Sequence, residues 1–305
     1  MGIRAWLLMV MPVLGLLACR PTSRTEVILY ASQDQVYAEP LLRRFTQRTG
    51  IEVRAIYDSE AVKSVGLANR LLSESSSPRA DVYWSNDELR TRQLAAAGVF
   101  ALTNGWASFG RRSRQWVIRT ESRAQIPSPP SLLDLTNAAW KGRFTLASPL
   151  FGSTATHFSV LRQIWGEPAW KDWIGALLAN QPLVVEGNSL VVRMVARGQA
   201  VIGLTDSDDI AAAQREGLPV QGLPLPAAGW NLRNSVGLIR GAPHPIPGRA
   251  LMDYLLSTEA REALQQVNAL EQETEGTPQE TALDWDRLLR ELPSTTEYLR
   301  ASFLR

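Results

Sequence analysis

Short polar loops that follow apolar, strand-like runs carry most of the residues of this 305-residue chain that could bind a ligand. Their hydroxyl, amide and carboxylate groups form directed hydrogen bonds. The candidate ligand-binding residues are Ser32, Gln33, Asp34, Ser59, Glu60, Asn86, Ser153, Thr154, Ala155, Asn188, Asp206 and Asp208. Each loop also opens an expected helix, so capping of free backbone N–H groups is the alternative role of these side chains.

Three of the carboxylates form a candidate metal site. Asp34, Asp206 and Asp208 offer hard oxygen donors, which suit Fe³⁺ and equally Ca²⁺, Mg²⁺ or Mn²⁺. Tyr37 and Tyr57 could add phenolate oxygens, although nothing in their spacing requires it. Helix capping remains the structural alternative for the aspartates of 205–209.

The loop Gly152–Thr156 favours an anion instead. A glycine followed by hydroxyl residues at a helix start leaves backbone N–H groups available to a small anion. Arg193 could supply a counter-charge, but its expected mid-helix position is typical of a solvent-facing side chain. A phosphonate, phosphate ester or carboxylate is therefore an alternative to a metal ion.

The residue inventory argues against an enzyme. The chain has no G-x-S-x-G nucleophile motif and no G-x-x-x-x-G-K-[ST] phosphate loop. The chain has only two histidines, His157 and His244, and one cysteine, which are too few of the usual zinc ligands to indicate a zinc site. A surface hydrolase that pairs a loop hydroxyl with His157 stays open as a minor alternative.

Strand-like and helix-like segments alternate along the chain, which predicts an α/β fold with parallel-rich sheets covered by helices. The expected strands are 27–30, 51–57, 80–84, 144–147, 183–186, 200–204 and 236–239. The expected helices are one that carries Leu41, Leu42 and Phe45 at helical spacing and ends at Gly50, followed by 61–73, 88–97, 156–165, 169–178, 190–197 and 210–216, with a helical tail from Pro247. The polar loops thus fall at the carboxyl ends of strands, where open α/β sheets bind ligands.

About 280 residues exceed the usual size of one domain, and the sequence predicts two. The first comprises 26–125 and 235–305, the second comprises 126–234, and the ligand cleft lies between them. The net charge of +2 gives no general reason to expect nucleic acid. We interpret the basic run Arg111–Arg114 as a solvated helix end.

Residues 1–19 have the features of an export signal. Arg4 precedes the apolar stretch 5–18, which is too short for a typical membrane-spanning helix. The stretch ends in Leu16-Leu17-Ala18-Cys19, which resembles a bacterial lipobox, so Cys19 is the candidate lipidation site. Residues 20–25 would form a short tether, and a doubly acylated cysteine would anchor the chain to a membrane.

Three segments together resemble a protein family: EVILYASQDQVYAEPLLRRFTQRTGIEV (26–53), PRADVYWSNDELRTRQLAAAGV (78–99) and GNSLVVRMVARGQAVIGLTDSDD (187–209). They are similar to the periplasmic solute-binding proteins of ABC importers, in the ferric-binding branch. The resemblance covers about residues 26–270. It implies a type II periplasmic binding protein fold, in which two α/β domains close on a ligand by a hinge motion.

The resemblance also implies partners and a location. The expected partners are a membrane permease and a separate ATPase, and the expected location is the periplasmic side of a bacterial envelope, as a lipid-anchored monomer. A metal ion would be cargo, and no cofactor is expected. A ligand-sensing module that reports to a receptor is the alternative use of the same fold.

The iron ligands of the ferric-binding branch do not match this chain. The family histidine falls at Asp34, the family glutamate at Asn86, and the family tyrosine pair near Ser207 and Asp208. The ligand predicted from the resemblance is therefore either ferric iron or a small anion such as a phosphonate or carboxylate.

Overall fold

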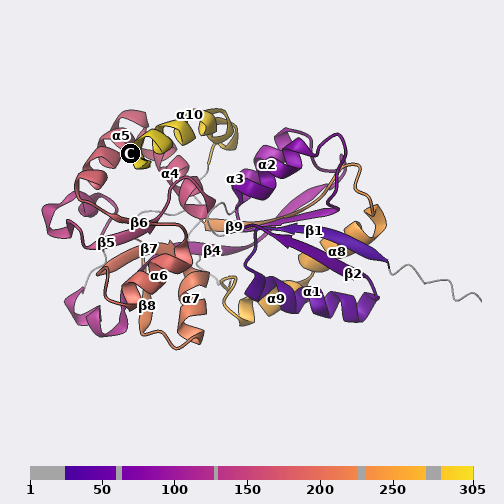
Figure 1. Cartoon of the computed structure of the whole chain (residues 1–305), viewed down its shortest axis with the longest axis horizontal. Helices are drawn as coiled ribbons and strands as arrows, with labels where there is room; N and C mark the ends of the chain where they lie inside the picture. The colour runs from indigo at the N-terminus through magenta and orange to yellow at the C-terminus, as the bar shows by residue number, and fades with distance from the viewer. Residues whose placement is uncertain (1–24, 60–63, 127–129, 226–230, 273–282, 305) are drawn as a thin grey trace, which may run out of the picture.

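The computed structural model describes residues 25–59, 64–126, 130–225, 231–272 and 283–304, which fold into two lobes joined by long strands (Figure 1). The strands are β1 (Glu26–Ala31), β2 (Glu52–Tyr57), β3 (Val82–Ser85), β4 (Trp106–Arg119), β5 (Phe144–Ala147), β6 (Leu183–Val185), β7 (Ile202–Asp206), β8 (Val220–Pro224) and β9 (Asn231–Leu238). The helices are α1 (Gln35–Thr49), α2 (Val65–Ser73), α3 (Glu88–Ala96), α4 (Gly152–Trp165), α5 (Glu167–Ala179), α6 (Asn188–Ala196), α7 (Ser207–Arg215), α8 (Pro245–Leu256), α9 (Thr258–Gln266) and α10 (Trp285–Phe303). Three short 3₁₀ helices complete the set: η2 (Thr120–Gln125), η3 (Leu133–Thr136) and η4 (Ala138–Trp140).

Both lobes belong to one continuous sheet with the strand order β2-β1-β3-β9-β4-β7-β5-β6, and β8 pairs with β4. Strands β1, β2 and β3 pair in parallel in the first lobe, as do β5, β6 and β7 in the second. Strands β4 and β9 run antiparallel to their neighbours and pass between the lobes. The predicted α/β alternation is confirmed, and the antiparallel crossing strands are an addition to it.

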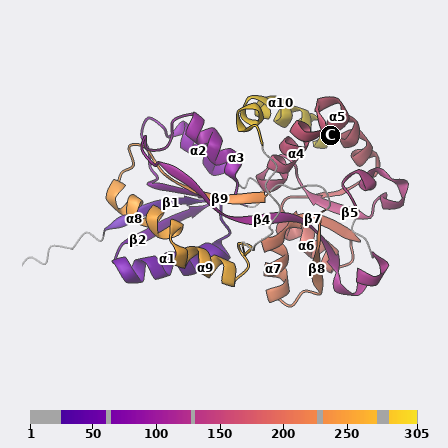
Figure 2. The same cartoon turned by 180° about the vertical axis from the view of Figure 1, so that it is seen from behind.

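Alternation along β1 explains how the first lobe is layered. Val27 and Leu29 belong to the core beneath α1, α8 and α9, whereas Tyr30 joins a second core beneath α2 and α3. Successive side chains of a strand point to opposite faces, so one apolar strand serves both cores. Figure 2 shows α1, α8 and α9 together on the face turned toward the viewer.

The second lobe follows the same rule along β4. Trp116 and Ile118 join the core that α4 and α5 cover, whereas Val117 joins the core beneath α6 and α7. Gly203 in β7 lies in close contact with the neighbouring strands and with Val191 of α6. A Cβ added there would lie 3.1 Å from both Thr145 Cγ2 and Val117 Cγ1. Only glycine therefore lets these elements approach so closely.

Helix α10 packs mainly against the second lobe, whereas the sequence analysis assigned residues 235–305 to the first domain. Leu299 belongs to the core of the second lobe, and the ring of Phe303 lies 6.1 Å from that of Phe158 in α4. Nearer its start, α10 places Leu288 in a cluster with Leu89 of α3. The last helix therefore lies along the second lobe and touches the first, while the domain boundaries themselves stay a prediction.

The basic run Arg111–Arg114 is not the solvated helix end that the sequence suggested. It lies in β4, and Arg112 and Arg114 are 1% and 4% exposed. A β-bulge between Phe109 and Arg112 shifts the register with β9 at this point. Bulges redirect the side chains that follow them. Here Arg112 lines the cavity between the lobes, and Arg114 pairs with Asp206 of the second lobe.

Candidate functional site

A small cavity lies between the lobes where several helices begin. Its volume is about 20 Å³, which accommodates roughly one water molecule. Its lining residues are Asp34, Asn86, Arg112, Ala147, Phe151, Gly152, Ser153, Thr154, Glu186, Gly187, Asn188, Asp206, Asp208 and Asp209. The lobes are therefore closed around this point in the structure.

The helices α1, α4, α6 and α7 all begin at the cavity. None of the four has a hydrogen bond from its N-cap side chain to its first turn, although Asp34 and Asp206 occupy the N-cap positions of α1 and α7. Asp87 does cap α3, because its carboxylate accepts from Leu89 N at 3.1 Å. The capping role is thus confirmed for α3 and is wrong for Asp34 and Asp206. Uncapped first turns leave backbone N–H groups that attract an anion.

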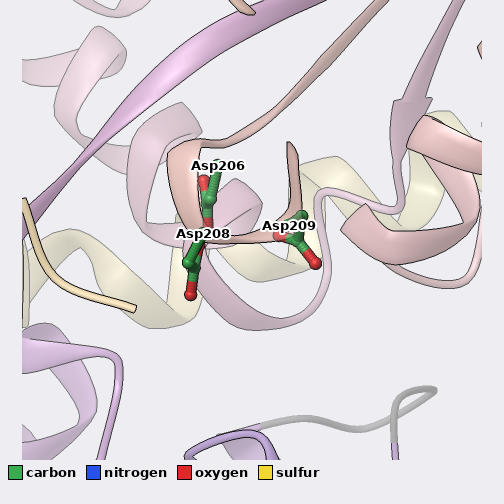
Figure 3. A group of neighbouring side chains, drawn as sticks. All are labelled: Asp206, Asp208 and Asp209. Carbon is green, nitrogen blue, oxygen red and sulfur yellow. The ribbon is translucent and has the colours of Figure 1, made fainter. Parts of the chain in front are cut away.

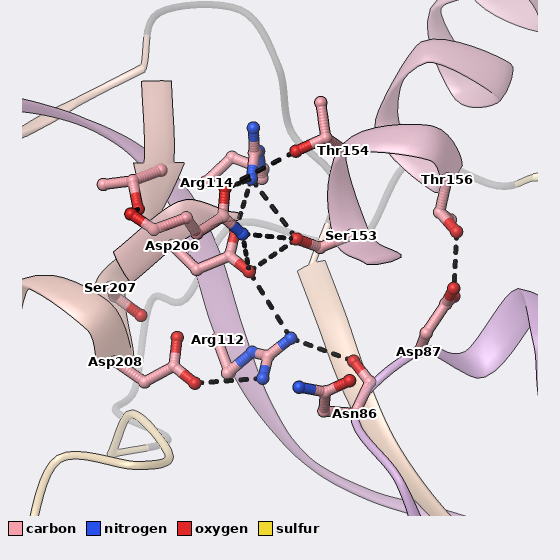
Figure 4. A network of polar contacts seen from close by, with 12 residues as sticks. Asn86, Asp87, Arg112, Arg114, Ser153, Thr154, Thr156, Asp206, Ser207 and Asp208 are labelled. Carbon is pink, nitrogen blue, oxygen red and sulfur yellow. Dashed lines mark hydrogen bonds and ion pairs between the residues drawn. The ribbon is translucent and has the colours of Figure 1, made fainter. Parts of the chain in front are cut away.

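Two buried arginines form the floor of the site (Figure 4). Arg112 Nη1 donates to Asp208 Oδ2 at 3.0 Å, and its Nη2 donates to the backbone oxygen of Asn86 at 2.9 Å. Arg114 Nη1 donates to Asp206 Oδ1 at 2.6 Å. Arg112 therefore connects the first lobe, through Asn86, with the second lobe, through Asp208.

Sequence reasoning missed these arginines because their charges were taken as a sign of exposure. The spacing of two that joins Arg112, Arg114, Trp116 and Ile118 was the available signal for a strand with one buried face.

Asp206 is fully engaged by its neighbours. Its Oδ2 accepts from Ser153 Oγ at 2.6 Å and from Asn188 Nδ2 at 3.1 Å, in addition to the Arg114 bond on Oδ1. Burial by itself would raise the pKa of Asp206, but attraction to Arg114 and Arg112 and the Ser153 hydrogen bond hold it below the usual range. The carboxylate is therefore ionised at neutral pH and already paired with a cation.

The acidic cluster at the start of α7 bears on the predicted metal site. One ligand atom from each of Asp206, Asp208 and Asp209 lies within 4.8 Å of the others, and in Figure 3 the side chains of Asp208 and Asp209 leave the helix in different directions. Two of these carboxylates carry ion pairs with Arg112 or Arg114. A metal ion would have to compete with two buried guanidinium groups for the same oxygens.

Phenolate ligands find little support in the geometry. Burial raises the pKa of Tyr37, whose hydroxyl donates to Asp208 O at 2.8 Å. Tyr57 lies in a different groove, between α1 and β2, and burial raises its pKa to about 12. Within the described part of the chain, no tyrosine lines the cavity between the lobes.

Seven of the twelve residues predicted to bind a ligand line the cavity: Asp34, Asn86, Ser153, Thr154, Asn188, Asp206 and Asp208. Four others lie elsewhere. Ser32 donates to Asp58 at 2.9 Å, Gln33 accepts from Asn234 at 2.9 Å, Ala155 is buried in α4, and Ser59 is exposed. Glu60 and the candidate lipidation site Cys19 lie outside the described residues. Glu186 lines the cavity without having been predicted to do so.

Two closing lobes with a polar cavity at converging helix starts define a class of hinged ligand-binding proteins. Residues 27–267 match the family described as bacterial extracellular solute-binding protein, and the chain belongs to that family. It is a binding protein and not an enzyme, as the sequence predicted.

Named relatives support the same class. The chain is 29% identical over 196 residues to a Fe(3+)-binding periplasmic protein of Serratia marcescens, an alignment that covers 58% of this chain and 56%, or about half, of that relative. It is structurally similar to iron-bound HitA from Pseudomonas aeruginosa, with a TM-score of 0.77, 19% identity and coverage of 92% and 99% of the two chains.

It is also similar to AfuA from Actinobacillus pleuropneumoniae with bound fructose-6-phosphate, with a TM-score of 0.76, 18% identity and coverage of 92% and 99%. Similarity at these identities shows the fold, and the predicted type II periplasmic binding protein fold is confirmed. Among the described residues, no helix has the length and apolar character needed to cross a bilayer.

Proposed function

We propose that this protein captures a small organic anion, such as a phosphate ester, a phosphonate or a carboxylate, and delivers it to the permease of an ABC importer. The observation that carries the proposal is the meeting of four helix starts, α1, α4, α6 and α7, at one cavity. Backbone N–H groups and the positive end of the helix dipole favour negative charge at such a point.

The polar lining of the cavity supports an organic anion rather than a simple inorganic anion such as phosphate. Asp34, Asp209 and Glu186 line the cavity together with the two ion-paired aspartates. Carboxylates accept hydrogen bonds from hydroxyl or ammonium groups, so the far end of a sugar phosphate or aminophosphonate suits this side of the site. The similarity to AfuA, which is described with bound fructose-6-phosphate, is in line with this ligand class.

Ferric iron is the second candidate. The oxygen cluster of Asp206, Asp208 and Asp209 and the relative described as a Fe(3+)-binding protein favour it. Against it stand the arginines that pair with Asp206 and Asp208. An ion of high charge would have to displace those pairs, whereas an anion at the start of α4 leaves them intact.

Native mass spectrometry with metal analysis, on protein purified from its own periplasm, tests the ligand class. The expected result is an organic mass lost on denaturation and no stoichiometric iron. Calorimetric titration of the stripped protein with fructose 6-phosphate, 2-aminoethylphosphonate, inorganic phosphate and ferric citrate then ranks the candidates. Stoichiometric iron together with tight binding of ferric citrate alone would reverse the proposal.

Asp34 provides a mutational test of the cavity. Asp34→Ala should weaken binding of the preferred anion about tenfold, or about 1.4 kcal/mol, without lowering the melting temperature of the free protein. Asp172→Ala, an exposed aspartate on α5, is the matched control and should bind as the wild type does. Equal affinity in all three proteins would mean that the ligand lies elsewhere.

We further propose that the chain is exported and held on the periplasmic side of the envelope by lipid on Cys19. The support is the apolar stretch 5–18 followed by Leu16-Leu17-Ala18-Cys19, together with family membership. Cys19→Ala should release the protein from the membrane fraction and block processing of the signal. Unchanged fractionation and an unchanged mass of the mature chain would disprove lipidation.

A further inference from the structure

Asp206 lies where several elements of the ligand site meet. It is the last residue of β7 and the N-cap of α7, and it is 2% exposed. Its three closest partners come from β4, α4 and α6: Arg114 at 2.6 Å, Ser153 at 2.6 Å and Asn188 at 3.1 Å. One carboxylate thus contacts the starts of two helices while it opens a third.

The partners of Asp206 also bond to one another. Asn188 Nδ2 donates to Ser153 Oγ at 2.9 Å, and Arg114 Nη1 lies 3.3 Å from Ser153 Oγ and 3.2 Å from Asn188 Oδ1. Figure 4 shows three members of this ring, Arg114, Ser153 and Asp206, with their contacts as dashed lines. Ser153 is in the first turn of α4 and Asn188 is the first residue of α6, so the ring fixes the two helix starts relative to each other.

We propose that Asp206 is a positioning residue, whose carboxylate orients the first turns of α4 and α6 so that their backbone N–H groups face one point of the cavity. The inference rests on the proposed anion-binding function. It assigns Asp206 a role through other residues rather than a direct contact with the ligand, because both its oxygens already accept hydrogen bonds within the protein.

The helix starts of α4 and α6 lack side-chain caps because their N-cap residues are Phe151 and Gly187. The hydroxyl of Ser153 and the amide of Asn188 are directed to Asp206 and not to the backbone of their own helices. Their N–H groups are therefore left for a ligand, while the buried ion pair with Arg114 supplies rigidity. Loss of the carboxylate should loosen both helix starts at once.

Hydrogen exchange of the ligand-free protein tests the positioning role directly. The amides of Ala155 and Val191 close the first turns of α4 and α6 through bonds to Phe151 O and Gly187 O, each at 3.2 Å. In Asp206→Asn, both amides should exchange about tenfold faster, while amides of the remote helix α9 keep the wild-type rate. Ser153→Ala should act mainly on Ala155, and Asn188→Ala mainly on Val191.

Asp208→Asn is the matched control. Asp208 is on the same helix start, is equally buried and pairs with Arg112 at 3.0 Å, so it tests the loss of one buried charge without removing the carboxylate that holds Ser153. It should leave exchange of Ala155 and Val191 unchanged. Asp206→Asn could unfold because Arg114 loses its counter-ion. In that case the double variant Arg114→Gln/Asp206→Asn, which removes both charges together, should show the same exchange pattern.

Calorimetric titration with fructose 6-phosphate and inorganic phosphate completes the test. At a temperature at which it stays folded, Asp206→Asn should bind the preferred anion about tenfold more weakly than the wild type. Weaker binding with unchanged exchange would overturn the inference, because Asp206 would then contact the ligand itself. Accelerated exchange in a protein whose wild type binds neither anion would uphold the positioning role and reject the proposed ligand class.

Discussion

His157 is a buried titratable side chain close to the ligand site. It lies in α4, is 1% exposed, and follows the hydroxyl residues at the start of that helix. Burial and repulsion by Arg114 lower the pKa of His157 to about 3. The imidazole is therefore neutral in the folded protein at neutral pH.

His157 should make the protein less stable in mild acid. The unfolded chain binds a proton near pH 6.5 and the folded chain only near 3, so acid favours unfolding, and the contribution is lost as the pH falls through that window. Between pH 7 and pH 5 the group should cost about 2 kcal/mol of unfolding free energy. Urea unfolding at both pH values measures this loss.

His157→Asn should lack that part of the loss, while His244→Asn, which keeps His157, should retain it. The chain has only these two histidines, so the comparison isolates one group. An equal loss in the wild type and His157→Asn would show that the imidazole is protonated in the folded state.

At the scale of elements, the bulge in β4 decides which side chains reach the site. Gly110 lies in this bulge with φ +57°, and a Cβ there would overlap the side chain of Leu270. Glycine is therefore required at position 110 for two reasons: the backbone is left-handed, and a side chain would collide with Leu270. Arg112 follows directly, so the geometry of the bulge sets which side chain of β4 lines the cavity.

Gly110→Ala should destabilise the protein by about 2–4 kcal/mol, through backbone strain plus the contact with Leu270. The matched control is Gly50→Ala, which has a similar φ of +72° but open space around the added Cβ, and it should cost about 1 kcal/mol. Chemical unfolding gives both values. Equal losses would mean that Leu270 moves aside without cost.

The elements that the sequence predicted well are local ones. A strand, a polar loop and a helix in succession, as in residues 26–49, are encoded by neighbouring residues, and so are the loops that bring Ser153, Asn188 and Asp206 to strand ends. The roles of Arg112 and Arg114 depend on partners about a hundred residues away, as in the pair of Arg112 with Asp208. Periodicity indicates that these arginines share a face with Trp116 and Ile118, but it carries no information about the distant partners that neutralise their charges.

At the scale of the whole molecule, hydrogen bonds fasten the two lobes on both sides of the cavity. On one side Tyr37 of α1 donates to Asp208 O at 2.8 Å, and Arg215 of α7 donates to the Tyr37 hydroxyl at 2.7 Å. On the other side Thr156 of α4 donates to Asp87 at 2.8 Å. Each lobe-spanning bond joins residues of different lobes, so these bonds stabilise the closed arrangement.

Tyr37→Phe should shift the protein toward an open form, because it removes two hydrogen bonds between the lobes. Two such bonds contribute about 1–2 kcal/mol, so ligand affinity should fall about tenfold. Small-angle scattering of the free protein should show a larger radius of gyration. Tyr254→Phe is the matched control, since its buried hydroxyl has no hydrogen-bond partner among the described residues. Identical scattering for Tyr37→Phe and wild type would argue against a closing role.

The two ends of the described chain belong to different lobes. Strand β1 begins the first lobe, whereas the last turns of α10 pack into the core of the second. If the chain is tethered at its start, the first lobe is held at the membrane and the second lobe moves relative to it during closure. A donor and an acceptor fluorophore attached near Thr25 and Leu304 would then report each capture event as a change in energy transfer, in real time and without a labelled ligand.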